Sequence, residues 1–301
     1  MIVALIEMEA HVRALEATGD FRVLRRFDPE RLPTHPAGAD EKVFRGLVVD
    51  VETTGVNAQV DELIEIALLP FVATAAGRLV SVEAAVRMLR DPGGPIPSEI
   101  TSLTGITDEM VAGQALDISR ISALIDAAHV VIAHNAAFDR VVVERYLQAA
   151  QNVRWGCSQR DVEWKAHGFT TQKLEWLLYA HLACFNASAH RAGADCAAAL
   201  AILVTPFSDG SLPLRDLLDA VKSVTTRLWA TNSPFEAKDA LKARGYRWND
   251  GSDGRPKAWS LDVDPSNAAA EREWLRDEIY RGRDGFREDA IDSKSRYSNR
   301  V

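Results

Sequence analysis

The sequence lacks the features that mark several classes of protein. It has three cysteines among 301 residues and no C-x-x-C pair, which argues against a disulfide framework or a structural zinc site. No apolar run approaches the roughly 18 residues of a membrane-spanning helix. The apolar start MIVALI stops at Glu7, which is too short for a secretory signal. There is also no internal repeat. We therefore expect a cytoplasmic protein without a membrane contact.

An excess of positive charge is also absent. The net charge of -8 argues weakly against a protein that coats duplex nucleic acid, because such proteins are usually basic. It says little about an enzyme that grips one strand end, since such an enzyme needs only a local basic rim. The composition, 47% hydrophobic and 26% charged, is ordinary for a globular chain, and the length favours about two domains.

The pattern of apolar and turn residues divides the chain into three parts. Residues 1–40 predict an N-terminal helix and a linker rich in proline and glycine. Residues 41–210 alternate between strand-like and helix-like runs, which predicts an α/β domain with a mixed central β-sheet flanked by helices. Residues 211–301 predict a connecting helix, a small α+β module and a flexible tail over residues 281–301.

The most informative stretch is GLVVDVETTG, residues 46–55. Because side chains alternate along a strand, Asp50 and Glu52 share one face. Adjacent carboxylates raise each other's pKa unless a cation lies between them, and Mg²⁺ takes oxygen ligands. The alternative is a polar edge strand ending at a turn. The apolar residues around this pair favour a central strand instead.

Two later segments add acidic residues. VVIAHNAAFDR (130–140) runs from a buried strand into a helix, and Asp139 lies one turn after Asn135. Taken alone, Asp139 is more often a solvent-facing helix residue. We interpret His134 as a strand-end histidine bonded to the backbone. Glu65 alternates with Leu63 and is a further acidic candidate, but it could equally be a satisfied or structural residue, so we leave it out of the site.

SAHRAGADCAAAL (188–200) supplies His190 and Asp195. Five residues on a regular helix would place them about 140° apart. We therefore expect His190 to precede the helix that carries Asp195, with Gly193 permitting the irregularity. Alone, His190 would be an ordinary exposed loop histidine. The prediction rests on the joint occurrence of these residues in this order.

The motifs D-x-E-T-T-G, H-N-x-x-F-D and H-x-x-x-x-D, in this order, resemble the DnaQ-like exonuclease family with the D-E-D-D-h active site. The proofreading subunit of bacterial DNA polymerase III is a member. The resemblance covers about residues 44–205 and implies a ribonuclease H-like fold and 3′→5′ polarity. It also implies that two Mg²⁺ or Mn²⁺ ions are held by Asp50, Glu52, Asp139 and Asp195, and that His190 is the general base.

The same resemblance implies positions that contact the substrate. Thr53 and Thr54 match positions that hold the terminal nucleotide. Asn135 and Phe138 match positions that support or stack the strand. Ile106, in LTGITDEMV, matches a position that wedges between terminal bases. For Ile106 and Phe138, core packing is an equal alternative.

The C-terminal module interleaves cations with flat rings, a composition that suits single-stranded nucleic acid. The candidates for such a secondary contact are Lys238, Lys242, Arg247, Trp248 and Trp259. The alternative, which we favour, is a small domain whose tryptophans form its core and whose lysines are solvated.

The sequence thus predicts a two-metal-ion 3′→5′ exonuclease that releases nucleoside 5′-monophosphates from single-stranded nucleic acid. DNA is the preferred substrate, and the enzyme would be of the repair or proofreading type. An RNA-trimming exoribonuclease and a non-catalytic nucleic-acid-binding subunit are the alternatives. All the expected ligands are present, which argues against the second alternative. A DNA polymerase or repair complex is a candidate partner, although no clamp-binding stretch of the Q-L-x-L-F kind is evident.

Overall fold

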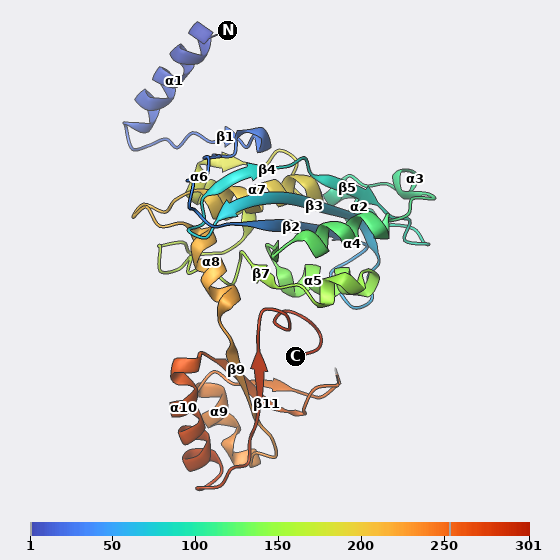
Figure 1. The fold of residues 1–301 in the computed structure, drawn as a ribbon, viewed down its shortest axis with the longest axis vertical. Helices are drawn as coiled ribbons and strands as arrows, with labels where there is room; N and C mark the ends of the chain where they lie inside the picture. Colours follow the sequence, from blue (N-terminus) through green and yellow to red (C-terminus); the bar gives the residue numbers. More distant parts are fainter. Residues whose placement is uncertain (1, 253) are drawn as a thin grey trace.

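The structure, a computed structural model, describes residues 2–252 and 254–301 (Figure 1). Its centre is a mixed sheet in the order β4-β3-β2-β6-β7, with β5 added beside β3. The strands are β2 (Val43–Thr53), β3 (Leu63–Thr74), β4 (Leu79–Val82), β5 (Val86–Leu89), β6 (Val130–Ala133) and β7 (Trp155–Cys157). β2 is antiparallel to β3 and parallel to β6, and β6 is parallel to β7.

Helices cover both faces of this sheet because its central strands are apolar on both sides. The elements are α2 (Ser98–Thr104), α3 (Asp108–Val111), α4 (Ile118–Ala127), α5 (Ala136–Tyr146), η2 (Gln148–Gln151), α6 (Leu174–Leu182), α7 (Ala192–Val204) and α8 (Pro213–Lys222). One core cluster joins the sheet to α6, α7 and α8, and a second joins its other face to α4 and α5. The predicted mixed sheet flanked by helices is therefore confirmed.

The N-terminal segment begins with α1 (Ile2–Glu16), which projects away from the sheet in Figure 1. It continues through β1 (Arg25–Arg26) and the short helix η1 (Pro29–Arg31). β1 pairs in parallel with β8 (Cys184–Phe185). Arg22 also donates to the carbonyls of Tyr179 and Ala180, at 2.7 and 3.0 Å. These contacts attach the segment to the chain around α6.

The C-terminal part forms a separate antiparallel sheet in the order β10-β11-β9-β12. Its elements are β9 (Thr225–Ala230), η3 (Phe235–Ala237), α9 (Lys238–Ala243), β10 (Arg247–Asn249), β11 (Ala258–Val263), α10 (Pro265–Trp274), the π-helical turn η4 (Leu275–Ile279) and β12 (Arg287–Ile291). Side chains of α9, α10, η4 and the sheet pack into one apolar cluster. No helix among the described residues is long and apolar enough to cross a bilayer.

The prediction of a flexible tail over residues 281–301 was wrong. β12 pairs with β9, and the chain beyond it packs against the large sheet. The fully buried Arg140 donates to the carbonyls of Ser293 at 3.3 Å and Arg296 at 2.6 Å, and also to that of Lys294. Trp155 of the edge strand β7 donates its backbone N–H to Ser293 at 2.8 Å. A polar segment is ordered here because its backbone satisfies a buried cation and a strand edge.

Candidate active site

Three of the predicted carboxylates meet at the end of β2. Oxygens of Asp50, Glu52 and Asp195 all lie within 4.8 Å of one another. Alternation places Asp50 and Glu52 on the same face of β2 as Val48, which packs against α7. Asp195 lies in the first turn of that helix. Packing α7 against β2 therefore brings residues distant in sequence into one acidic cluster.

The fourth carboxylate, Asp139, reaches the same end of the sheet from α5. Its Oδ1 accepts the backbone N–H of Val51, the residue between Asp50 and Glu52, at 3.2 Å. Its side chain is buried, with 4% exposed. Among neighbouring charges, Asp139 contributes most to the raised pKa of Asp50. All four predicted carboxylates thus lie at or beside the carboxyl end of β2.

The raised pKa values of the four carboxylates show that ionising all of them together costs free energy. Burial, followed by the charge of Asp139, raises the pKa of Asp50 well above its usual range. Burial and then Asp195 raise the pKa of Glu52 to about 8. Burial raises the pKa of Asp139 to about 7 and that of Asp195 to about 6. Desolvation and mutual repulsion both penalise the charged forms.

His190 lies before α7, as expected, and in the left-handed backbone region with φ 61°. Its backbone N–H donates to Asp195 Oδ2 at 2.9 Å. Its imidazole is half exposed, and Nε2 lies 3.9 Å from a carboxylate oxygen of Glu175. The loop thus holds the carboxylate through its backbone and leaves the imidazole accessible. Asn186 Nδ2 also donates to Asp195 Oδ1, at 2.8 Å.

The expected reason for Gly193 was wrong. This glycine lies inside α7 and is absent from the residues with positive φ. A Cβ there would approach Cδ of Arg87 to 2.5 Å. The irregular backbone that separates His190 from the helix is at His190 itself. Gly193 instead allows the β5 side chain to pass close to α7.

Glu65, which the sequence interpretation left out, supports the site from β3. It lies opposite Glu52 in the strand register and is 2% exposed. Its carboxylate accepts from Arg191 at 3.2 and 3.3 Å and from the N–H of Ala192 at 3.1 Å. Glu65 therefore fixes the start of α7 on the sheet, between His190 and Asp195.

The turn after β2 uses its threonines internally. The hydroxyl of Thr53, a buried residue, donates to the carbonyl of Gly55 at 2.5 Å. Thr54 Oγ1 accepts the N–H of Glu62 at 2.9 Å, and the Thr54 N–H donates to the Glu62 carbonyl at 2.9 Å. The Thr53 hydroxyl proton is therefore used within the turn. This differs from the contact with a nucleotide that was expected of Thr53. The Thr54 hydroxyl donates to no acceptor among the described residues, so its proton is available for a ligand.

Two of the predicted substrate positions share an open groove. Asn135 and Phe138 line a space of about 530 Å³ with Val56, Arg160 and Asn299. Asn135 and Arg160 are exposed, and Val56 is 91% exposed. Phe138 is only half-buried, so one part of its ring remains for contacts outside the core. No local sequence pattern indicates Arg160, or Asn299 of the tail, as part of this groove.

Ile106 does not occupy a surface position. Its side chain is fully buried and packs in a cluster with Ile64, Ile96 and Val111. The structure thus corrects the expected wedge, because a side chain enclosed in this way presents no surface to a base. Leu103, on the preceding helix α2, is 51% exposed and is an apolar side chain that this segment presents to solvent.

His134 is held by its neighbours, as interpreted from the sequence. Its Nε2 lies 2.8 Å from the carbonyl of Gln172, and its Nδ1 lies 2.9 Å from the hydroxyl of Ser158. Burial lowers the pKa of His134 to about 4. A neutral imidazole tying two loops together is a structural element of the fold.

The candidate residues of the C-terminal module come from different elements and differ in exposure. Trp248 and Trp259 are cross-strand partners with ring centroids 5.7 Å apart. Trp248 is 51% exposed, whereas Trp259 packs partly in the module's core. Alternation along β10 places Arg247 on the opposite face. Lys238 and Lys242 are exposed on α9. A nucleic-acid role for this set stays a prediction.

The carboxylate cluster fits divalent cations by its chemistry. Its donors are all carboxylate oxygens, the ligands that hard cations prefer, and their raised pKa values are what a bound cation would reverse. Arg191 lowers the pKa of Glu52 less than the neighbouring carboxylates raise it. Its guanidinium is paired with Glu65 at 3.2 Å. The charge of the cluster is therefore left for a ligand to neutralise.

Comparison with known protein families and sequences gives consistent matches. The RNase_T family model, described as "Exonuclease", matches residues 47–203. The PolC-type DNA polymerase III of Halalkalibacterium halodurans is 39% identical over 98 residues, which is 31% of this chain and 6% of the polymerase. That of Bacillus subtilis is 36% identical over 95 residues, again 31% and 6%. The match thus spans a small fraction of each of these polymerases.

Solved structures give weaker likenesses. Exonuclease X in complex with 5′ overhanging duplex DNA is 22% identical with a TM-score of 0.41, covering 57% of this chain and 99% of that one. The zinc-bound E. coli ExoI–ssDNA complex is 13% identical with a TM-score of 0.49, covering 73% and 63%. A 3′-exonuclease that recognises a histone mRNA stem-loop is 16% identical with a TM-score of 0.46, covering 57% and 85%.

Proposed function

Because this chain belongs to the exonuclease family, we propose that the carboxylate cluster is the active site of a 3′→5′ exonuclease that releases nucleoside 5′-monophosphates from single-stranded DNA. The observation that carries the proposal is the meeting of Asp50, Glu52 and Asp195 within 4.8 Å, with Asp139 bonded to the backbone between the first two. A phosphodiester is an anion, so an acidic cluster can accept it only with cations present.

The chain's own residues then have separate roles. Asp50, Glu52, Asp139 and Asp195 would hold two divalent ions, Mg²⁺ or Mn²⁺, which supply an activated water and stabilise the charge on the departing oxygen. His190 would accept the proton of the attacking water, because its imidazole is accessible while its backbone is fixed to Asp195. Glu65 would position both residues by anchoring the start of α7.

The groove beside the turn after β2 is the proposed path of the strand. Phe138 offers part of a ring for a base, Arg160 offers a cation for a phosphate, and Asn135 offers an amide. The Thr54 hydroxyl has a free proton to donate to the terminal nucleotide. Preference for DNA over RNA is supported by the polymerase relatives, which also make a DNA polymerase or repair complex the proposed partner.

The test uses single-stranded DNA and RNA of one sequence, each labelled at the 5′ end or the 3′ end. With Mg²⁺ or Mn²⁺ we expect 5′-labelled DNA to shorten stepwise and 3′-labelled DNA to release a labelled mononucleotide at once. RNA should react more slowly. EDTA, Asp50→Asn and Asp195→Asn should each abolish the reaction.

Three results would overturn parts of this proposal. Faster degradation of RNA would reverse the substrate preference. Shortening from the 5′ end would reverse the polarity. Undiminished activity of Asp50→Asn would remove the carboxylate cluster from the reaction.

A further inference from the structure

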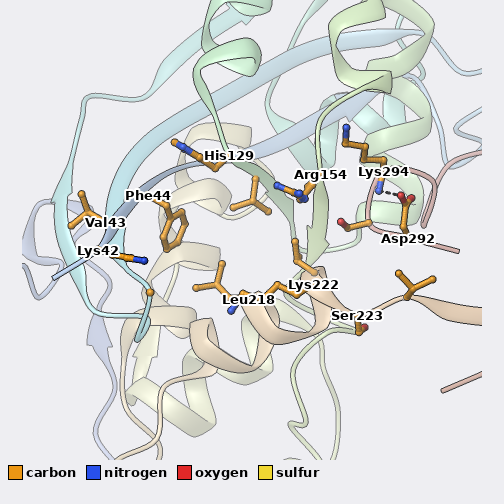
Figure 2. Close-up of a pocket in the computed structure, with 15 residues that line it drawn as sticks. Lys42, Val43, Phe44, His129, Arg154, Leu218, Lys222, Ser223, Asp292 and Lys294 are labelled. Atoms are coloured by element: carbon orange, nitrogen blue, oxygen red, sulfur yellow. Dashed lines mark hydrogen bonds between the residues drawn. The ribbon is translucent and has the colours of Figure 1, made fainter. Parts of the chain in front are cut away.

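A second cavity lies at the other end of β2, away from the carboxylate cluster. It has a volume of about 540 Å³ and is formed where β2, β6 and β7 begin, with α8 and the chain after β12 as its other walls (Figure 2). Val43 at its edge and Asp50 in the cluster are seven residues apart on one strand, roughly 23 Å at about 3.3 Å per residue. Its ligand would therefore not contact the carboxylate cluster.

The floor of this cavity is aliphatic. Val130, Leu218 and Val221 are 2%, 8% and 6% exposed and come from β6 and α8. At its edge, Val43 and Val224 are far more open, at 50% and 44%. A volume of this size is typical of a ligand site and accommodates one or two large apolar side chains. Exposed valines around a closed apolar floor gain most from a ligand that is itself apolar at its centre.

The rim of the cavity is cationic. Lys42, Arg154, Lys222 and Lys294 line it, together with the carboxylate of Asp292. Figure 2 shows these side chains distributed around the floor, and the carboxylate of Asp292 accepts the backbone N–H of Lys294 at 3.0 Å. Lys222 pairs with Asp219 at 3.0 Å. Within the described part of the chain, Lys42, Arg154 and Lys294 form no salt bridge, although Lys294 acts on the neighbouring Asp292 through its charge.

These positive charges stand out in a chain with a net charge of -8. Cations around an apolar floor are complementary to a ligand with an apolar centre and anionic flanks. Single-stranded nucleic acid has the anionic phosphates, but its bases bind by stacking on exposed flat rings. Phe44, whose phenyl ring belongs to the wall, is half-buried and packs edge-on against Phe71, with ring centroids 6.1 Å apart.

We propose that this cavity binds an acidic peptide segment of a protein partner, with one aliphatic or aromatic side chain in the floor and carboxylates against Lys42, Arg154 and Lys294. The cavity opens beside Ser223 and Val224, which join α8 to β9, so the partner would lie next to the connection to the C-terminal module. The assignment rests on charge and shape complementarity and does not depend on the proposed exonuclease activity.

The test measures fluorescence anisotropy of a labelled hexapeptide, Asp-Glu-Leu-Asp-Phe-Glu, against the full chain. The matched probes are Asn-Gln-Leu-Asn-Phe-Gln and a labelled dT12 oligonucleotide. We expect the acidic peptide to bind at least about tenfold more tightly than the neutral one, a difference of about 1.4 kcal/mol. Its affinity should fall as salt is raised, because exposed charges are screened.

Variants assign the binding to this cavity. Arg154→Glu and Lys294→Glu should each weaken binding about fivefold or more, and Val224→Asp should weaken it through the apolar edge. Lys165→Glu, an exposed lysine outside the cavity, is the matched control and should change binding less than about twofold. The melting temperature of each variant shows whether the chain is still folded.

The outcomes are separable. No binding of the acidic peptide up to about 1 mM, equal binding of the neutral peptide, or unchanged binding by the folded Arg154→Glu variant would each overturn the proposal. Tighter binding of the oligonucleotide that the acidic peptide competes away would make the cavity a nucleic-acid site, which also overturns it.

Discussion

The two ends of β2 carry opposite charges, and at each end some charged side chains form no salt bridge within the described part of the chain. At the carboxyl end, Asp50 and Glu52 face Asp195. At the amino end, the strand begins beside the cationic cavity. By contrast, the buried carboxylate of Glu65, which lies opposite Glu52, does have a charged partner, Arg191 at 3.2 Å. We infer that like charges without salt-bridge partners mark the two places where an external ligand would complete a site.

The largest expected effect is the loss of nuclease activity when a carboxylate at the carboxyl end of β2 is neutralised. Asp50→Asn or Asp195→Asn should lower kcat at least about 10³-fold, because several kcal/mol of charge stabilisation in the transition state depend on these ligands, and each 1.36 kcal/mol is tenfold. Single-turnover rates on a 5′-labelled oligonucleotide measure the loss. Asp126→Asn, an exposed carboxylate of α4, is the matched control. A variant of the cluster that keeps more than a tenth of the wild-type rate would contradict the assignment of the carboxylate cluster as the active site.

The next largest effect concerns His190, the proposed general base. His190→Ala should reduce the single-turnover rate about 10²-fold or more and should remove the rise of rate with pH near neutrality, because alanine cannot take the proton that the imidazole accepts. His35→Ala, in the N-terminal linker, is the control for losing an exposed histidine. Wild-type-like rate and pH dependence in His190→Ala would exclude the imidazole from proton transfer.

The carboxylate end was more predictable from sequence than the cationic end. Alternation alone places Asp50 and Glu52 on one face, because a strand has a period of two. The convergence of Asp139 and Asp195 required the family's order of motifs, since periodicity does not specify which helix packs where. The cationic cavity combines separate segments of the chain, and no local pattern relates Lys42 to Lys294.

The errors have the same physical cause. The alternative of a paired, structural Glu65 could not be decided from the sequence, because its partner Arg191 lies 126 residues away. The tail was expected to be flexible because its composition is polar, but its carbonyls are acceptors for Arg140, 153 or more residues away. Gly193 was assigned a backbone role because the approach of Arg87 is a tertiary contact. Patterns within one element were reliable, whereas pairings between elements depended on packing.

A third prediction removes the tail that borders the cationic cavity. Deleting residues 292–301 removes the tail carbonyls that accept from Arg140 and leaves Glu144 as its remaining hydrogen-bond partner, at 2.6 Å. Breaking such a buried network costs about 3 kcal/mol, and the melting temperature should fall by about 6–12 °C. Thermal denaturation followed by circular dichroism measures this shift. Replacing Arg300→Gln, whose side chain is exposed, is the milder control. An unchanged melting temperature after deletion would show that the tail contributes no stability.

The smallest effect is the pH dependence of stability without metal. The folded pKa values of Glu52 (about 8), Asp139 (about 7) and Asp195 (about 6) exceed their ordinary values of 4.5 and 3.8. The folded state therefore holds protons that the unfolded chain releases, so these groups favour folding at low pH and lose this effect between about pH 4 and 8. In EDTA, the melting temperature should fall from pH 5 to pH 8.

Two additions sharpen this prediction. Asp50→Asn should flatten the fall, because it removes one of the repelling charges. Mn²⁺ should raise the melting temperature at pH 8 more than at pH 5, because the ion binds the ionised carboxylates of the folded state. A metal-free melting temperature that rises from pH 5 to pH 8, with the same slope in Asp50→Asn, would contradict burial and mutual repulsion as the origin of the raised pKa values.

The most direct test is calorimetric titration of Mn²⁺ into the metal-free protein at pH 8, with Asp50→Asn beside the wild type. The convergence of four carboxylates predicts two ions per chain for the wild type and weaker binding of fewer ions for the variant. Wild-type protein that binds no Mn²⁺, or a variant that binds it with the same stoichiometry and affinity, would contradict the assignment of this cluster.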